Sequence, residues 1–393
     1  MVTDERIYFD WNATAPLRAA ARDAVSSAMS LTGNASSVHA EGQAARRLVE
    51  KARAQVAQLI GGQAKNVTFT SGATEANMLA LTPALQTDGK KRPRDKLLVS
   101  GVEHPSVLCG GRFPFGQVKI LPVGGDGVVD LHALRRALAR CERPLVSVML
   151  ANNETGVLQP IAEIAAIVHD AGGLLHVDAV QGPGRIACDI GTLGADLMSL
   201  SAHKLGGPQG AGALIRQNTG FGDLHIAEPL IKGGGQECSL RAGTENVAAI
   251  VGFGAAAEAA AAARQADAAH MAHLRDRLEA GLKQVTPEAV IFGENAERLP
   301  NTTLFAVPGI KAETAIIAFD LNGIALSSGS ACSSGKVTAS HVLAAMGVDP
   351  ALARGAVRVS LGWSSTENEV ERFLQTWNML TGSLLKERRG IAA

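Results

Sequence analysis

Seven short runs of apolar and β-branched residues recur between residues 65 and 216, and longer stretches with a helical pattern separate them. Several runs are apolar almost throughout, which is typical of strands buried on both faces of a mostly parallel sheet. The runs are NVTFT (66–70), KLLVS (96–100), VKILPV (118–123), PLVSVMLA (144–151), GLLHVDA (173–179), DLMSLSA (196–202) and GALIR (212–216). The alternation predicts an α/β architecture in which helices cover the sheet.

Charge and hydropathy limit the classes of partner. Of the 393 residues, 46% are hydrophobic and 19% are charged, so the chain can bury a large core. Lys plus Arg and Asp plus Glu both number 37, so no net field is expected to attract nucleic acid or an anionic membrane. The N-terminus MVTDERIYFD carries charges where a signal peptide needs apolar residues. We therefore expect a cytoplasmic protein that acts on a small substrate and contacts neither nucleic acid nor membrane.

A second, smaller domain is expected after the sheet. An Ala-rich helical stretch runs from about residue 248 to 285, and strand-like apolar runs follow at 303–309 and 315–323. The predicted division is a large domain of residues 15–261 and a smaller α+β domain of residues 1–14 and 262–393.

The five cysteines are odd in number, widely spaced and without a CxxC pair, which argues against a disulfide framework or a zinc site. We therefore expect no bound metal. Cys332 differs from the others because it lies in SSGSACSSG (327–335), a run of Ser, Gly and Ala. A free cysteine is often a small buried filler, but such a run offers little apolar packing. It predicts a mobile loop that carries a reactive thiol.

Polar segments follow five of the predicted strands, where ligands bind in open α/β sheets. They are SGATE, EHP, NNETG, DAVQ and SAHK. In the first, residues 71–74 open a helix whose free N–H groups and dipole favour a phosphate. A capping box in which Ser or Thr caps the helix and Glu75 reaches back explains the same residues equally well.

Lys204 and Asp178 follow two of these strands. A lysine in a partly desolvated pocket loses its proton more easily and can form a Schiff base, although a lone lysine is usually a solvated surface residue. Pyridoxal phosphate needs such a lysine, a carboxylate for its ring nitrogen and a phosphate cup. His104 could stack on the ring, unless it is a structural histidine. Gln181, one helical turn beyond Asp178, could donate to the phenolic oxygen.

Eight motifs in order give the chain a specific resemblance. They are FTSGATEAN, EHPSV, NNETG, HVDAVQ, SAHKLGGPQGAGAL, RAGTEN, SSGSACSSG and VRVSLG. From YFDWNATAP to about residue 370 the chain resembles the cysteine desulfurases, pyridoxal-phosphate enzymes of the class V aminotransferase group with fold type I. The resemblance implies a mostly parallel seven-stranded sheet flanked by helices, with a smaller α+β domain.

The resemblance also implies a role for each matching residue. Lys204 would hold the cofactor, Asp178 would pair with the ring nitrogen, Gln181 would donate to the phenolic oxygen, and His104 would stack and act as an acid or base. The phosphate would be bound by Ala73, Thr74, Ser201 and His203, with Thr244 supplied by the second subunit of a homodimer. Arg358 would pair with the substrate carboxylate, assisted by Asn153, which also lies at the cofactor, and by Asn34.

The implied reaction converts L-cysteine to L-alanine and moves the sulfur to Cys332 as a persulfide. The sulfur would then pass to an acceptor or scaffold protein, for iron–sulfur cluster assembly or related sulfur delivery. A selenocysteine lyase could share every cofactor residue and depend less on Cys332. An ordinary class V aminotransferase is disfavoured by the Cys332 segment. A non-catalytic sulfur carrier is disfavoured by the intact set of Lys204, Asp178 and His104.

Overall fold

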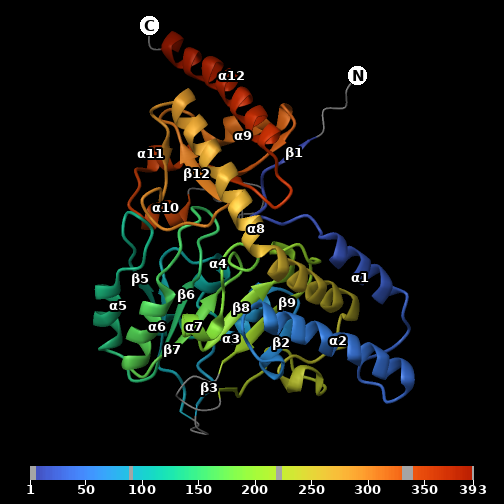
Figure 1. The fold of residues 1–393 in the computed structure, drawn as a ribbon. Helices are drawn as coiled ribbons and strands as arrows, with labels where there is room; N and C mark the ends of the chain where they lie inside the picture. The colour runs from blue at the N-terminus through green and yellow to red at the C-terminus, as the bar shows by residue number, and fades with distance from the viewer. Residues whose placement is uncertain (1–5, 88–91, 218–223, 330–339, 392–393) are drawn as a thin grey trace.

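The structure is a computed structural model that describes residues 6–87, 92–217, 224–329 and 340–391, with side chains up to residue 382. A larger part contains a central sheet and most of the helices, and a smaller part contains the C-terminal residues (Figure 1). The long helix α8 (Val247–Val285) runs from one part into the other.

The central sheet has seven strands, as the sequence predicts. In order across the sheet they are β2 (Val67–Thr70), β9 (Gly212–Arg216), β8 (Leu197–Ser201), β7 (Leu174–Asp178), β6 (Pro144–Met149), β4 (Lys96–Ser100) and β5 (Val118–Leu121). All neighbouring pairs are parallel except those of β9, which is antiparallel to both β2 and β8. The predicted α/β class and the mostly parallel sheet are confirmed.

Helices cover both faces of this sheet, and side chains that alternate along the strands divide between them. Val146 and Val148 of β6 face the core formed with the helices α2, α5, α6 and α8, whereas Leu145 faces the core formed with α3 and α4. The helices of the larger part, besides α8, are α1 (Ala19–Met29), α2 (Ala40–Leu59), α3 (Ala73–Ala80), α4 (Pro105–Leu108), α5 (Leu131–Leu138), α6 (Ile161–Asp170) and α7 (Ile190–Leu193). A two-stranded ribbon pairs β3 (Leu85–Gln86) with β10 (His225–Ile226).

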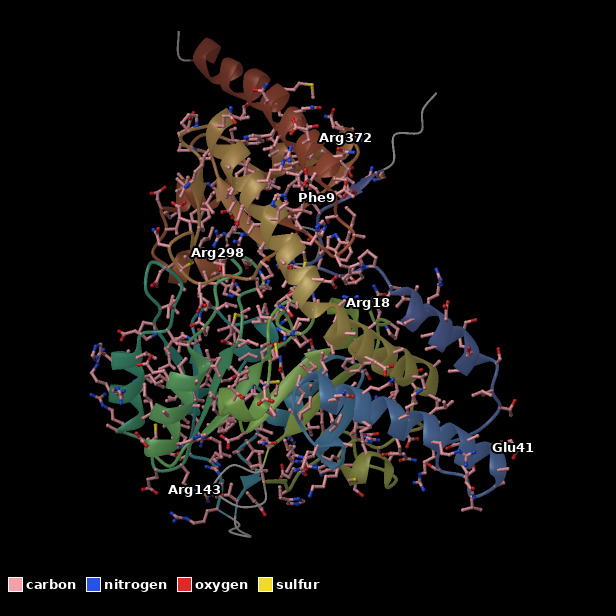
Figure 2. The ribbon with its side chains drawn as sticks, in the orientation of Figure 1. Phe9, Arg18, Glu41, Arg143, Arg298 and Arg372 are labelled. Carbon is pink, nitrogen blue, oxygen red and sulfur yellow. The ribbon has the colours of Figure 1, made fainter. Side chains whose placement is uncertain are left out.

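The smaller part is built on an antiparallel sheet. Its strands, in order, are β11 (Val290–Ile291), β12 (Thr302–Ala306), β15 (Val357–Ser360) and β14 (Ser327–Ser328). Its helices are α9 (Ala312–Leu321), α10 (His341–Ala345), α11 (Pro350–Ala353) and α12 (Glu367–Ile391). The N-terminal strand β1 (Ile7–Tyr8) pairs with β13 (Ile324–Ala325), and Phe9 lies in the same part (Figure 2). The ring centroids of Phe9 and Phe373 are 6.1 Å apart.

Helix α8 contributes to both cores. Phe253 and Ala256, near its N-terminus, pack in the core of the larger part, whereas Leu274 and Leu278 pack in that of the smaller part. By length and composition, it is the one helix in the described parts of the chain that could cross a membrane. Its packing accounts for its apolar side chains. The helix passes residues 261 and 262 without a break, and the domain boundaries given above stay a prediction.

One predicted strand is wrong. Residues 315–323 were expected to be extended, but most of them belong to helix α9. Ala312, Ala315 and Phe319 are its buried residues, at helical spacing. A short apolar run does not by itself separate a buried strand from a buried helix.

Candidate active site

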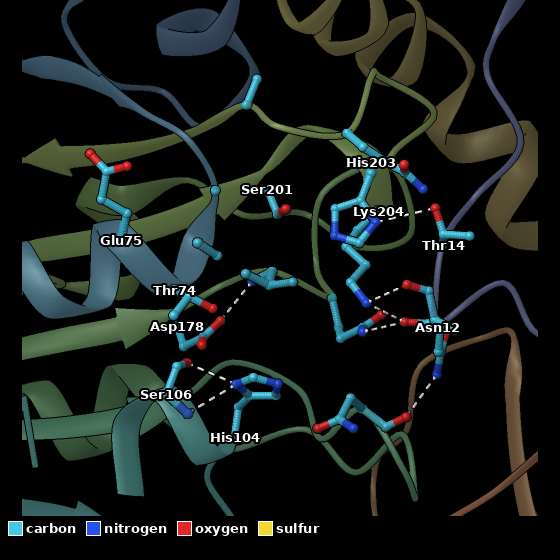
Figure 3. Close-up of a pocket in the computed structure, with 18 of the residues that line it drawn as sticks. Asn12, Thr14, Thr74, Glu75, His104, Ser106, Asp178, Ser201, His203 and Lys204 are labelled. Atoms are coloured by element: carbon cyan, nitrogen blue, oxygen red, sulfur yellow. Dashed lines mark hydrogen bonds between the residues drawn. The ribbon is translucent and has the colours of Figure 1, made fainter. Parts of the chain in front are cut away.

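A cavity of about 840 Å³ opens beyond the carboxyl ends of the central strands (Figure 3). The predicted site residues that line it are Ala73, Thr74, His104, Asn153, Asp178, Gln181, Ser201, His203, Lys204 and Arg358. These residues come from six separate segments of the sequence. Five of the segments lie where strands of the central sheet end at the same edge, and the sixth, with Arg358, comes from β15 of the smaller part.

Lys204 ends a 3₁₀ turn, η3 (Ala202–Lys204), that directly follows β8. Its Nζ donates to the carbonyl oxygens of Asn12, at 2.6 Å, and Ala13, at 2.7 Å (Figure 3). The amine therefore points into the cavity and is held there by the N-terminal segment. Sequence reasoning missed Asn12, although its segment YFDWNATAP carries part of the resemblance.

Asp178 is the last residue of β7, and its side chain is largely buried. Its Oδ2 accepts a hydrogen bond from Asn77 Nδ2 at 2.9 Å, and its Oδ1 accepts one from the Val180 amide at 3.1 Å. Asn77, on α3, was also missed. Its Nδ2 donates to Ser106 Oγ at 2.9 Å as well, so it links Asp178 to the segment that carries His104.

His104 caps α4 with its Nδ1, which accepts from the Ser106 amide at 3.2 Å and lies 2.8 Å from Ser106 Oγ. Because an amide can only donate, Nδ1 is unprotonated and the neutral ring carries its proton on Nε2. Burial lowers the pKa of His104; Asp178 opposes this shift, whereas Lys204 and His341 add to it. The ring is therefore neutral near pH 7.

The start of α3 offers two free donors. Its N-cap is Gly72, which has no side chain, and no described residue accepts from the amides of Ala73 and Thr74. Glu75 does reach back, but to the Ser71 amide at 2.9 Å, so the capping-box alternative holds only in part. A Cβ on Gly212 of β9 would lie 2.5 Å from the Gly72 carbonyl carbon, so glycine at 212 lets the two segments approach closely.

Ser201 and His203 line the same cavity from the end of β8. His203 Nδ1 lies 3.2 Å from Thr14 Oγ1. Burial, with a further contribution from Lys204, lowers the pKa of His203 to about 4. The ring is therefore neutral near pH 7, and it can donate a hydrogen bond to an anion but adds no charge.

Gln181 lies in a turn after β7, and the one helical turn expected between Asp178 and Gln181 is absent. Gly182, Pro183 and Gly184 follow directly, and they favour a turn. Gln181 Nε2 donates to the Asn12 carbonyl oxygen at 3.1 Å, and its Oε1 accepts from Arg185. The amide therefore lies at the cavity in a fixed orientation.

Arg358 extends from β15 of the smaller part, and only 2% of its surface is exposed. Its Nη2 donates to Asp10 Oδ1 at 2.6 Å, and its Nη1 donates to the Asn153 carbonyl oxygen at 2.9 Å. Its Nε is buried and has no partner among the described residues. Arg358 lines the cavity and keeps donor hydrogens that these two contacts do not use, so the guanidinium suits a carboxylate ligand.

Glu154 follows Asn153 and is almost fully buried. Ser340 Oγ donates to its Oε2 at 2.5 Å. Burial raises the pKa of Glu154 to about 7, although the Ser340 hydrogen bond and the charge of Arg358 oppose the shift. A carboxyl group that titrates near neutrality therefore lies beside Asn153, and sequence reasoning did not single it out.

Three predicted residues are not brought to the cavity by the described part of a single chain. Asn34 is exposed, and its Oδ1 accepts from the Ser36 amide at 2.9 Å. Thr244 is exposed ahead of α8. Cys332 lies outside the described residues.

The cavity meets the requirements of pyridoxal phosphate. Lys204 could bind the aldehyde, Asp178 could pair with the ring nitrogen, and the amides of Ala73 and Thr74 could donate to the phosphate. The neutral His104 ring can stack on the pyridine. The donors and acceptors present thus fit this cofactor.

Comparisons with known proteins agree with this arrangement. The family model for aminotransferase class-V matches residues 7–373. A cysteine desulfurase of Cereibacter sphaeroides is 42% identical over 378 residues, 94% of each chain. An IscS-like cysteine desulfurase of Mycobacterium tuberculosis is 38% identical over 393 residues, 98% of each chain.

Solved structures show the same fold. A NifS-like protein from Rickettsia africae superimposes with a TM-score of 0.85 at 36% identity, over 96% of this chain and 100% of that one. A structure described as SspA in complex with cysteine has a TM-score of 0.73 at 27% identity, over 92% of this chain and 100% of that one.

Proposed function

Because the chain belongs to the class-V aminotransferase family and to the cysteine desulfurases within it, we propose that its cavity binds pyridoxal 5′-phosphate and L-cysteine and that the reaction releases L-alanine. The observation that carries the proposal is the convergence of Lys204, Asp178 and Arg358 on one cavity. Lys204 would bind the aldehyde of the cofactor covalently, Asp178 would pair with its ring nitrogen, and Arg358 would pair with the substrate carboxylate.

The residues that would hold the cofactor are Lys204, Asp178, Gln181, His104 and the phosphate-binding set of Ala73, Thr74, Ser201 and His203. When bound, pyridoxal phosphate supplies an electron sink for the Cα of an amino acid. With the cofactor bound, Asp178 would keep the ring nitrogen protonated, and the Nζ of Lys204 would take the Cα proton of the substrate. The neutral His104 ring would stack on the pyridine and could exchange protons with the substrate.

Arg358 binds the substrate carboxylate through the donors that Asp10 and Asn153 leave free. Asn153 assists at the cavity. In a homodimer, Thr244 would complete the phosphate site of the partner subunit, which agrees with its exposure and with its absence from the cavity lining of one chain. Asn34 would assist Arg358 in substrate binding. The dimer is therefore part of the proposal.

Cys332 accepts the sulfur. Its thiolate attacks the sulfur of cysteine, so that an S–S bond forms while the C–S bond breaks. The electron pair of the broken bond stays on the substrate carbon, which takes up a proton and becomes the methyl group of alanine. Cys332 is left as a persulfide, and no external oxidant or reductant is needed. The persulfide sulfur then passes to an acceptor protein in the cytoplasm, for iron–sulfur cluster assembly or related sulfur delivery.

Product analysis tests this function against its alternatives. With L-cysteine alone, the purified protein should release alanine in step with persulfide or sulfide. Turnover of selenocysteine but not of cysteine would move the assignment to a selenocysteine lyase. Alanine that forms only when a keto acid is added to the reaction would move it to an aminotransferase.

A further inference from the structure

Arg185 is a buried guanidinium that contacts two residues of the cavity lining, Gln181 and Lys204. Its Nη1 donates to the Gln181 carbonyl oxygen at 2.9 Å and to Gln181 Oε1. Its Nη2 reaches the carbonyl oxygens of Trp11, at 3.4 Å, and Lys204, at 3.5 Å. All four acceptors are neutral, and the ion pairs of the described residues do not include Arg185. A buried charge without a carboxylate partner is costly.

The contact with Arg185 fixes the orientation of the Gln181 side-chain amide. A guanidinium has only donors, so the atom that it contacts must be the amide oxygen. The amide nitrogen then points the other way and uses one hydrogen on the Asn12 carbonyl oxygen. Its second hydrogen remains for a ligand in the cavity, which Gln181 lines.

The charge of Arg185 has a second effect on the same amide. Burial and the nearby Arg358 lower the pKa of Arg185 to about 10, so the group is still protonated near pH 7. The other titratable group beside it is Cys188, and burial raises the pKa of that thiol to about 12, so the thiol is neutral. A positive charge on the oxygen side of an amide draws electrons from its nitrogen and makes the N–H a stronger donor.

We propose that Arg185 is a positioning residue that holds Gln181 as a donor toward the phenolic oxygen of the cofactor. The inference rests on the proposed function, because it assumes pyridoxal phosphate in the cavity. Arg185 does not touch the cofactor itself. It acts through the Gln181 amide, which it both orients and polarises.

The test is the pH titration of the visible absorption of the cofactor-loaded protein. A hydrogen-bond donor stabilises the phenolic oxygen as an anion and so favours loss of the proton that this oxygen shares with the Lys204 nitrogen. Loss of the donor should therefore move the midpoint of the absorption titration to higher pH. Arg185→Met and Gln181→Ala should each raise the midpoint, by about one pH unit for a charge-assisted hydrogen bond. Arg185→Lys, which keeps the charge and a donor, should stay near the wild-type midpoint.

A double-mutant cycle separates this role from a merely structural one. In the Gln181→Ala background, Arg185→Met should add no further shift, because the residue through which it acts is gone. An equal shift in both backgrounds, or no shift in Arg185→Met alone, would overturn the inference. If Arg185→Met does not fold, Arg185→Gln takes its place in the cycle. A wild-type protein that gains no visible band with pyridoxal phosphate would instead refute the proposed function, and this inference with it.

Discussion

The Nζ of Lys204 lies 2.6 Å from the carbonyl oxygen of Asn12, although the two residues are 192 positions apart in the sequence. The N-terminal segment thus forms one wall of the site and holds the amine in the cavity before a ligand arrives. A lysine held in this way is ready to bind an aldehyde, which leads to the first prediction.

Borohydride reduction of the cofactor-loaded protein should fix pyridoxal phosphate to the peptide that contains Lys204. Lys204→Ala should lose the covalent label and all measurable turnover, because no other lysine lines the described cavity. Lys119→Ala, at an exposed position of β5, is the matched control and should label as the wild type does. Label on a different lysine, seen by peptide mass spectrometry, would contradict the assignment.

Arg358→Lys should raise KM for L-cysteine roughly 10- to 100-fold, the loss expected when a charge-assisted bidentate contact becomes a single one. Steady-state kinetics measure the effect, and the absorption of the bound cofactor should not change. Arg354→Lys, an exposed arginine in the same part of the fold, is the control. A wild-type KM in Arg358→Lys would show that the carboxylate binds elsewhere.

Glu154→Gln should change how stability depends on pH. The pKa of Glu154 in the folded protein, about 7, lies above the ordinary glutamate value of 4.5, so the carboxyl group ionises at lower pH in the unfolded state than in the folded state. The free energy of unfolding of the wild type therefore falls as pH rises between these two values, by up to about 3 kcal/mol. The Glu154→Gln variant has no ionisable group at this position and does not lose this stability. Urea unfolding should show that the free energy of unfolding of Glu154→Gln, relative to that of the wild type, increases from about pH 5 to pH 8. Glu163→Gln, at an exposed position of α6, should show no such gain; an equal gain there would refute the explanation.

Complementation tests the shared phosphate site. Thr244→Ala homodimers should bind pyridoxal phosphate weakly, and Lys204→Ala homodimers should not bind it covalently. A heterodimer of the two variants has one site with Lys204 from the first chain and Thr244 from the second. That site should regain wild-type cofactor affinity, measured by fluorescence titration of purified heterodimers. If Thr244 acted within its own chain, no intact site would form and affinity would stay low.

The sequence predicts the parts of the site that follow strands. Asp178 and Lys204 can be predicted from the sequence because apolar runs indicate buried strands, and a polar residue at the end of such a strand lies at the ligand-binding edge of the sheet. Asn12, Asn77 and Arg185 were missed because their importance comes from contacts between distant segments: 169 positions separate Gln181 from Asn12. A polar residue in an N-terminal segment, a helix or a turn gives no local signal of such a contact.

In the proposed reaction, sulfur leaves L-cysteine and is carried by Cys332. The most direct measurement is the mass of the Cys332 peptide after brief exposure of the cofactor-loaded protein to L-cysteine, without added reductant. We predict one added sulfur on this peptide and none on the peptides of Cys109, Cys141, Cys188 and Cys238. Cys332→Ser should bind the cofactor normally but release almost no alanine, because a serine hydroxyl cannot carry a persulfide. Sulfur on another cysteine, or wild-type alanine release by Cys332→Ser, would contradict the account.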